Sequence, residues 1–187
     1  TLAYASERNG NWQLFLAKIA RKEEANFPNA TIIEEEVLLP SATVERAYPQ
    51  FSPDGKELAF IEERNRLMVI NLDTKKVRQI TDGSTWFSTD GNFDYQWSPD
   101  GKWFTLEFIG NRHDPYSDIG LVSAKGDSPI TNLTNSGYMS GSPRWVLDGN
   151  AILFTTERYG MRAHASWGSQ NDAMLVFMNQ DAYDKFR

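Results

Sequence analysis

The two histidines, His113 and His164, are the residues of this 187-residue chain best suited to acid–base chemistry or metal binding. Both lie near acidic residues, but a metal site needs a third ligand at a suitable distance in the fold, which the sequence does not supply. A Ser–His–Asp triad is no better supported. There is no Gly-x-Ser-x-Gly, and the stretch WGSQND lacks the strand–turn–helix context of a nucleophile elbow. We therefore expect no catalytic residue, no metal and no cofactor in this chain.

Three aspartates recur inside a repeated ten-residue phrase, which reads FSPDGKELAF at 51–60, WSPDGKWFTL at 97–106 and, in a degenerate form, WVLDGNAILF at 145–154. Asp54, Asp100 and Asp148 could form a ring of carboxylates around a ligand. Ser-Pro-Asp-Gly also has the chemistry of a type I turn, with Pro presetting φ, Gly in the last place and Asp bonding to its own backbone. We expect the three aspartates to be turn residues.

The spacing of the phrase indicates architecture. The aspartates lie 46 and 48 residues apart, close to the period of propeller blades. Segments rich in aromatic and β-branched residues flank each turn, and further strand-like segments follow. LAYASER at 2–8 aligns with LAFIEER at 58–64, which indicates an earlier copy.

The predicted fold is all-β. We expect a partial β-propeller of about four four-stranded antiparallel blades, of which the first and the last are incomplete. The predicted blades span 1–46 (strands two to four), 47–93, 94–141 and 142–187 (strands one to three). Since propellers close with roughly 4–8 blades, this chain is predicted to be part of a ring, completed by the rest of the propeller or by self-association through blade edges.

The aromatic residues of the strands are predicted to form the core between blades: Phe51, Phe60, Trp97, Trp103, Phe108, Trp145 and Phe154. The pairs Glu7–Arg8, Glu63–Arg64 and Glu157–Arg158 recur at one blade position. We expect these arginines to tie one blade to its neighbour, with contact to a peptide carboxylate as the alternative.

Binding is expected in the long loops that join strands two and three and that join one blade to the next. These loops combine aromatic side chains with arginine, as interface hot spots do. The candidate partner-binding residues are Trp86, Phe87, Arg112, His113, Tyr116, Arg158, Tyr159, Arg162, His164 and Trp167. Phe93 lies in the same loops and is expected to belong to the same surface.

Composition limits the partners. The formal net charge is −6, so no basic field is present to attract nucleic acid. No apolar run is long enough to insert in a membrane. There is no cysteine, which excludes thiolate chemistry. A peptide or a protein is the expected partner.

The repeat resembles the TolB-type, WD-repeat-like propeller family on the strength of its aromatic residue followed by Ser-Pro-Asp-Gly-Lys, over residues 47–154. The segment 157–187 is similar to the last propeller segment before the catalytic half of tricorn-like serine peptidases of Bacteroidetes-type bacteria. That resemblance implies a periplasmic or secreted protein, with a PDZ module and a serine-peptidase core outside this chain. The chain opens TLAYAS without an initiator Met or a signal-like segment, so we expect that a leader or a larger N-terminal portion has been removed. No residue here matches the catalytic motifs of that family.

The expected function is therefore a non-catalytic propeller segment of a tricorn-like peptidase that binds or admits peptide substrate. The alternative is a TolB-like scaffold that binds another envelope protein through the same loops. A propeller hydrolase is disfavoured, since the sequence contains no convergent catalytic set.

Overall fold

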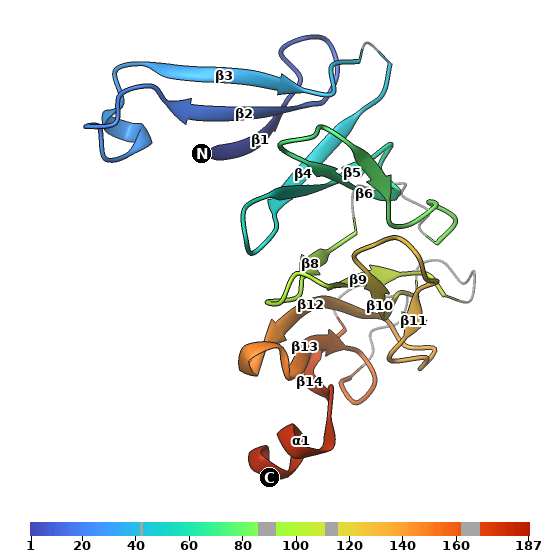
Figure 1. Ribbon diagram of the computed structural model, residues 1–187. Helices are drawn as coiled ribbons and strands as arrows, with labels where there is room; N and C mark the ends of the chain where they lie inside the picture. The colour runs from blue at the N-terminus through green and yellow to red at the C-terminus, as the bar shows by residue number, and fades with distance from the viewer. Residues whose placement is uncertain (42, 86–92, 111–115, 162–168) are drawn as a thin grey trace.

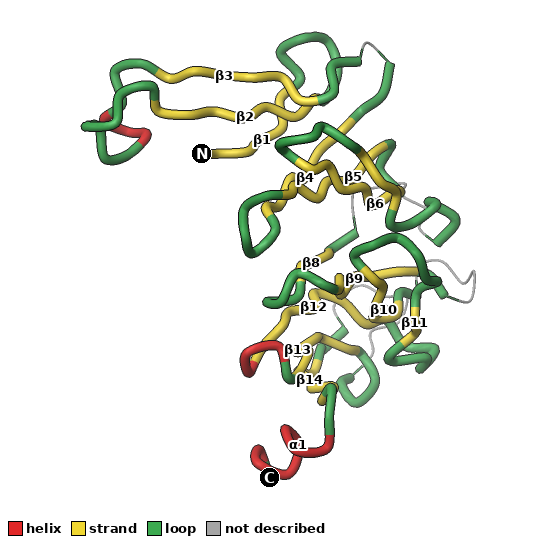
Figure 2. Tube along the Cα trace, viewed as in Figure 1, coloured by secondary structure: helices red, strands yellow, loops and turns green. Residues whose placement is uncertain are grey.

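The computed structural model describes residues 1–41, 43–85, 93–110, 116–161 and 169–187. Its strands form four antiparallel sheets that follow one another from the N-terminal to the C-terminal end of the molecule (Figures 1 and 2). The first sheet contains β1 (Leu2–Ser6), β2 (Gln13–Ile19) and β3 (Ile33–Leu38). The second contains β4 (Arg46–Phe51), β5 (Glu57–Glu62), β6 (Arg66–Asn71) and β7 (Val77–Gln79). The third contains β8 (Tyr95–Trp97), β9 (Trp103–Phe108), β10 (Asp118–Ser123) and β11 (Thr131–Asn132). The fourth contains β12 (Ser140–Val146), β13 (Ala151–Thr156) and β14 (Asp172–Phe177).

Strand order within each sheet follows the chain, as β4-β5-β6-β7 and β8-β9-β10-β11 show. This is the meander expected of a four-stranded repeat, and the first and last sheets have three described strands each. β4 begins at Arg46 and β12 at Ser140, one and two residues before the predicted boundaries. The all-β prediction, with four antiparallel sheets, is confirmed.

The Ser-Pro-Asp-Gly turns connect the first two strands of the second and third sheets. In the second sheet the Gly55 N–H donates to the Ser52 carbonyl over 2.9 Å. Gly55 has φ +71°, a left-handed conformation that a residue with Cβ adopts at a cost. The equivalent Gly101, at φ +70°, likewise donates its N–H to the Ser98 carbonyl over 2.9 Å. The predicted turn is confirmed in both places.

The third copy of the phrase makes a different turn. Without Ser and Pro, its residues Leu147–Gly149 form the short 3-10 turn η2, in which all three have positive φ. The Leu147 side chain is also 47% exposed. Left-handed Leu and Asp cost free energy that the Ser-Pro-Asp-Gly turns avoid.

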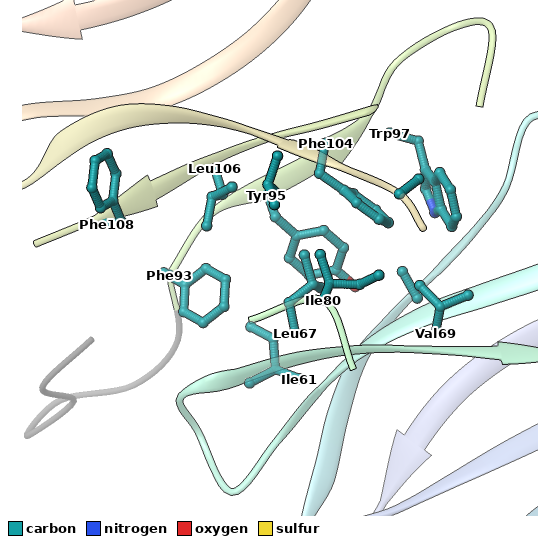
Figure 3. Packing of buried hydrophobic residues seen from close by; sticks show 13 residues of the cluster. Ile61, Leu67, Val69, Ile80, Phe93, Tyr95, Trp97, Phe104, Leu106 and Phe108 are labelled. Carbon is teal, nitrogen blue, oxygen red and sulfur yellow. The ribbon is translucent and has the colours of Figure 1, made fainter. Parts of the chain in front are cut away.

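The sheets pack face to face, and the largest core lies between the second and the third (Figure 3). Trp97 and Phe104, with ring centroids 4.1 Å apart, meet Leu67 and Val69 of the second sheet there. Each sheet offers alternate strand residues to the sheet before it and to the sheet after it. The predicted core is confirmed except for Trp103, which is 41% exposed because it opens β9 at the turn end of the sheet.

Two helical segments were not anticipated by the repeat. The short turn η1 (Phe27–Asn29) lies in the β2–β3 connection, and helix α1 (Gln180–Phe186) follows β14. Tyr183 and Phe186 of α1 pack on Phe177, with ring centroids 5.5 and 5.2 Å away. Among the described residues, no helix is long and apolar enough to cross a membrane.

Candidate functional site

Three of the predicted partner-binding residues lie in the described part of the chain. Tyr116 precedes β10 and is 40% exposed, and Tyr159 follows β13 and is 66% exposed. The guanidinium carbon of Arg158 lies 5.2 Å from the Tyr159 ring centroid, within cation–π range. These side chains therefore offer solvent-accessible aromatic and cationic groups on the β9–β10 and β13–β14 connections.

The other seven predicted site residues lie outside the described residues: Trp86, Phe87, Arg112, His113, Arg162, His164 and Trp167. Including Phe93 in the binding loops was wrong. Its side chain is 1% exposed and belongs to the core between the second and third sheets, because the chain has already turned inward before β8.

A small hollow adjoins Arg158 between the third and fourth sheets. Leu133, Ser136, Phe154 and Met174 are among the residues that line it, and its volume is about 140 Å³. Ligand pockets for drug-sized molecules are larger, about 300–1,000 Å³. The hollow can accept one side chain at most, so a longer ligand would have to lie across the exposed loops.

The repeated aspartates form turns, as predicted. Asp54 accepts hydrogen bonds from the Ser52 hydroxyl (2.7 Å) and the Lys56 N–H (3.1 Å). The hydroxyl of Ser52 is the main cause that lowers the pKa of Asp54, and the backbone N–H adds to it. The Ser98 hydroxyl, 2.6 Å away, lowers the pKa of Asp100 in the same way.

Asp54 and Asp100 do line one hollow of about 370 Å³ between adjacent turns. Each carboxylate is nevertheless engaged by its own turn. Within the described ranges, no group of three or more His, Cys, Asp or Glu residues is placed to hold a metal ion.

The recurring arginines do not link neighbouring sheets, so that prediction was wrong for the two whose ion pairs are described. Arg8 pairs with Glu35 of β3 over 2.9 Å, inside the first sheet, and its guanidinium carbon lies 3.9 Å from the Phe15 ring centroid. Arg64 pairs with Glu45, just before β4 of its own sheet, over 3.5 Å. Arg8 follows β1 and Arg64 follows β5, and the acid that each one pairs with belongs to its own sheet.

Several links between sheets come instead from the residue before the aromatic in each phrase. Gln50 Nε2 donates to the Tyr95 carbonyl over 2.9 Å, from β4 to β8. Gln96 Oε1 accepts from the Trp145 N–H over 2.7 Å, from β8 to β12. Arg144 holds the same place in β12, and its Nη2 atom lies 3.4 Å from Oδ2 of Asp94. The recurrence of long polar side chains at this place was the available sequence signal, and sequence reasoning missed it.

These bonds also occupy backbone groups on the first strands. Trp97 Nε1 donates to the Gln50 carbonyl over 3.3 Å, and the Tyr95 hydroxyl donates to the Tyr48 carbonyl. A peptide that approached the first strands would find these carbonyls already bonded. Binding of a peptide as an additional strand of the sheet is therefore disfavoured at this edge. Binding of a peptide to the side chains of the loops is not affected.

The chain belongs to the family of the dipeptidyl peptidase IV (DPP IV) N-terminal region, which matches residues 13–106. A curated relative, the uncharacterized peptidase YuxL of Bacillus subtilis (strain 168), is 29% identical over 119 residues, which cover 62% of this chain and 18% of that protein.

Solved structures share the fold. The tricorn protease matches 95% of this chain with a TM-score of 0.63 and 13% identity, over 17% of its own length. The oligogalacturonate lyase of Vibrio parahaemolyticus matches 96% of this chain with a TM-score of 0.61 and 14% identity, over 49% of its length. At such identities the likeness shows the fold alone, and a protease and a lyase share it. The chain spans less than a fifth of the Bacillus relative and of the tricorn protease.

Proposed function

We propose that the four sheets are consecutive blades of a β-propeller in a tricorn-like serine peptidase, and that this segment binds or admits the peptide substrate without catalysing its cleavage. The observation that carries the proposal is the family match over residues 13–106, which spans β2 and β3 of the first sheet, the whole second sheet and the start of the third. The peptidase relative supports it independently.

The binding surface that we propose consists of the β9–β10 and β13–β14 loops and of the β7–β8 connection between the second and third sheets. Tyr116, Arg158 and Tyr159 are its described members, and the seven predicted residues outside the described ranges extend it. Aromatic rings and a guanidinium group contribute most to binding when a partner removes them from water. The opposite ends of the sheets offer short turns whose aspartates are already hydrogen-bonded, which makes them poorer binding elements.

A peptide-binding measurement on the purified 187-residue chain tests this proposal. A library of fluorescent unstructured peptides is screened by anisotropy, and the best binder is then titrated into Arg158→Gln and Tyr159→Ala variants. Each substitution is expected to weaken binding at least about fivefold, because hot-spot truncations cost more than about 1 kcal/mol. No peptide turnover is expected.

Trp103→Ala is the matched control, because Trp103 is an exposed aromatic residue at the opposite end of β9. It is expected to leave peptide affinity unchanged. Absence of any peptide binding, or an equal loss of affinity in Trp103→Ala, would contradict the proposed surface. Peptide hydrolysis by the chain itself would contradict its non-catalytic role.

A further inference from the structure

The hollow beside Arg158 is lined mainly by apolar side chains of the third and fourth sheets. Leu133 follows β11, and Met174 and Val176 belong to β14. All three are only partly buried against the core between these sheets, while Phe154 of β13 is almost completely buried in it. A side chain that entered the hollow would therefore extend the core between the two sheets.

The hollow lies where the preceding junction contains two aromatic rings. In the repeated phrase, Thr156 holds the place of Phe108, and Ser140 pairs with Thr156 across β12 and β13. In the third sheet the N–H before Phe108 donates to the carbonyl after Phe93 over 2.8 Å, so Phe93 holds the place of Ser140. Both phenylalanines are buried in the core between the second and third sheets (Figure 3). The two small residues that replace them line the hollow.

Three hydroxyl groups that line the hollow are already hydrogen-bonded within the protein. The Ser140 hydroxyl donates to the Thr156 hydroxyl over 3.2 Å, and the Thr134 hydroxyl donates to the Asp118 carboxylate over 2.6 Å. A polar guest would lose its hydrogen bonds to water without gaining new ones from these groups. The hollow therefore favours an apolar guest.

Arg158 adds a positive charge to this site. It lines the hollow, is exposed, and takes part in no ion pair among the residues that the structure describes. Its guanidinium carbon lies 5.2 Å from the ring centroid of Tyr159, which is also exposed. The guanidinium group is thus available to a carboxylate next to the guest side chain.

We propose that the hollow receives one bulky apolar side chain of a bound peptide, while Arg158 pairs with an acidic residue beside it. The inference rests on the proposed peptide-binding function and adds which peptides the surface selects. The volume of about 140 Å³ limits the guest to a single side chain, and the rings of Phe93 and Phe108 show that bulky apolar groups fit this place in the repeat.

Four fluorescent peptides that differ at two positions test the selection by anisotropy on the full chain. The parent is Gly-Ser-Leu-Glu-Ser-Gly with blocked ends, so that glutamate carries its one carboxylate. Replacing leucine by serine is expected to weaken binding at least about tenfold, because burial of a leucine side chain is lost. Replacing glutamate by glutamine, alone or together with the first change, is expected to weaken it about fivefold.

Met174→Trp fills the hollow at a strand position that accepts an aromatic residue. It is expected to bring the leucine peptide down to the affinity of the serine peptide. Leu153→Trp is the matched control, since Leu153 alternates with Phe154 on β13 and is 37% exposed on the opposite face of the sheet. It is expected to keep the preference for leucine. Arg158→Gln is expected to abolish the difference between glutamate and glutamine but to keep the preference for leucine.

The outcomes separate this inference from the function on which it rests. If the peptide library contains binders but the leucine and serine peptides bind equally, the hollow is not the selecting site and the peptide-binding function stands. A preference for leucine that survives in Met174→Trp would also overturn the inference. If no peptide of the library binds, both proposals fail. Should Met174→Trp not fold, the leucine and serine peptides still decide the matter on the wild-type chain.

Discussion

The junction between the second and third sheets differs in kind from the junction between the third and fourth. The first is an apolar core, in which thirteen of the described residues cluster, and Trp97, Gln50 and Tyr95 add hydrogen bonds across it. At the second, the cluster has three buried members among the described residues, and Glu107 of β9 accepts a hydrogen bond from the Ser142 N–H of β12. Sheets built from one repeated sequence pattern can therefore pack together through different kinds of contact, mainly apolar at one junction and partly polar at the next.

Equivalent residues show how the difference arises. Ala59 and Ile61 face the third sheet from β5, whereas Thr105 and Glu107 take their places in β9 and face the fourth. Apolar burial contributes about 25 cal/mol per Å², while a polar group only offsets its own desolvation through hydrogen bonds. We therefore expect the junction between the third and fourth sheets to contribute less to the free energy of unfolding.

Truncating one buried phenylalanine at each junction tests this difference most strongly. Phe104 is fully buried against Tyr95 and Trp97, and Phe154 is 4% exposed in the smaller cluster. Phe104→Ala is expected to lower the free energy of unfolding by an amount near the top of the range of about 3–5 kcal/mol, and Phe154→Ala by one near its bottom. Urea denaturation provides the measurement. Equal losses would mean that the two junctions contribute alike.

A second pair of variants examines how closely the second and third sheets approach. Gly126, after β10, has φ +72°, and a Cβ there would lie 2.1 Å from the Gln79 carbonyl oxygen of β7. Gly126→Ala combines left-handed strain with a backbone clash and should cost about 2–5 kcal/mol. Gly55→Ala is the control, with φ +71° and open space around it, and should cost about 1–2 kcal/mol. Thermal unfolding measures both, and a Gly126→Ala loss no larger than the control would refute the close approach.

The fold could be predicted because the turn residues, the hydrophobic alternation and the repeat spacing all indicated the same architecture. Ser-Pro-Asp-Gly fixes the turn between two strands, alternation fixes the buried faces, and the regular spacing of the turns fixes the succession of sheets. The prediction that Trp103 belongs to the core was wrong because its position, at the turn end of β9, exposes the ring despite its hydrophobic character. Trp103 aligns with Glu57, at the solvent-exposed end of the strand.

The contacts between sheets could not be predicted equally well. Arg8 and Arg64 recur in the pattern, but which acid each one meets depends on backbone geometry that the pattern does not encode. Glu107 was visible in the sequence as a polar residue in WFTLEFI at the position where ELAFIEE has the apolar Ile61. Helix α1 has no counterpart in the other repeats, so periodicity could not indicate it.

The smallest predicted effect concerns a single indole N–H. Trp97 and Trp145 hold equivalent places in β8 and β12. Trp97 Nε1 donates to the Gln50 carbonyl over 3.3 Å. Trp145 Nε1, by contrast, is among the buried side-chain atoms in the described ranges that lack a hydrogen-bond partner. Trp97→Phe removes this hydrogen bond and leaves the Gln50 carbonyl without it, whereas Trp145→Phe removes a buried N–H donor that has no partner. Trp97→Phe should therefore lower the free energy of unfolding by about 1 kcal/mol more than Trp145→Phe. Urea denaturation of both variants gives this difference directly, free of the ring-size change that they share. If the two substitutions cost the same, the hydrogen bond at Trp97 adds nothing, and the junctions would differ through apolar packing and Glu107 alone.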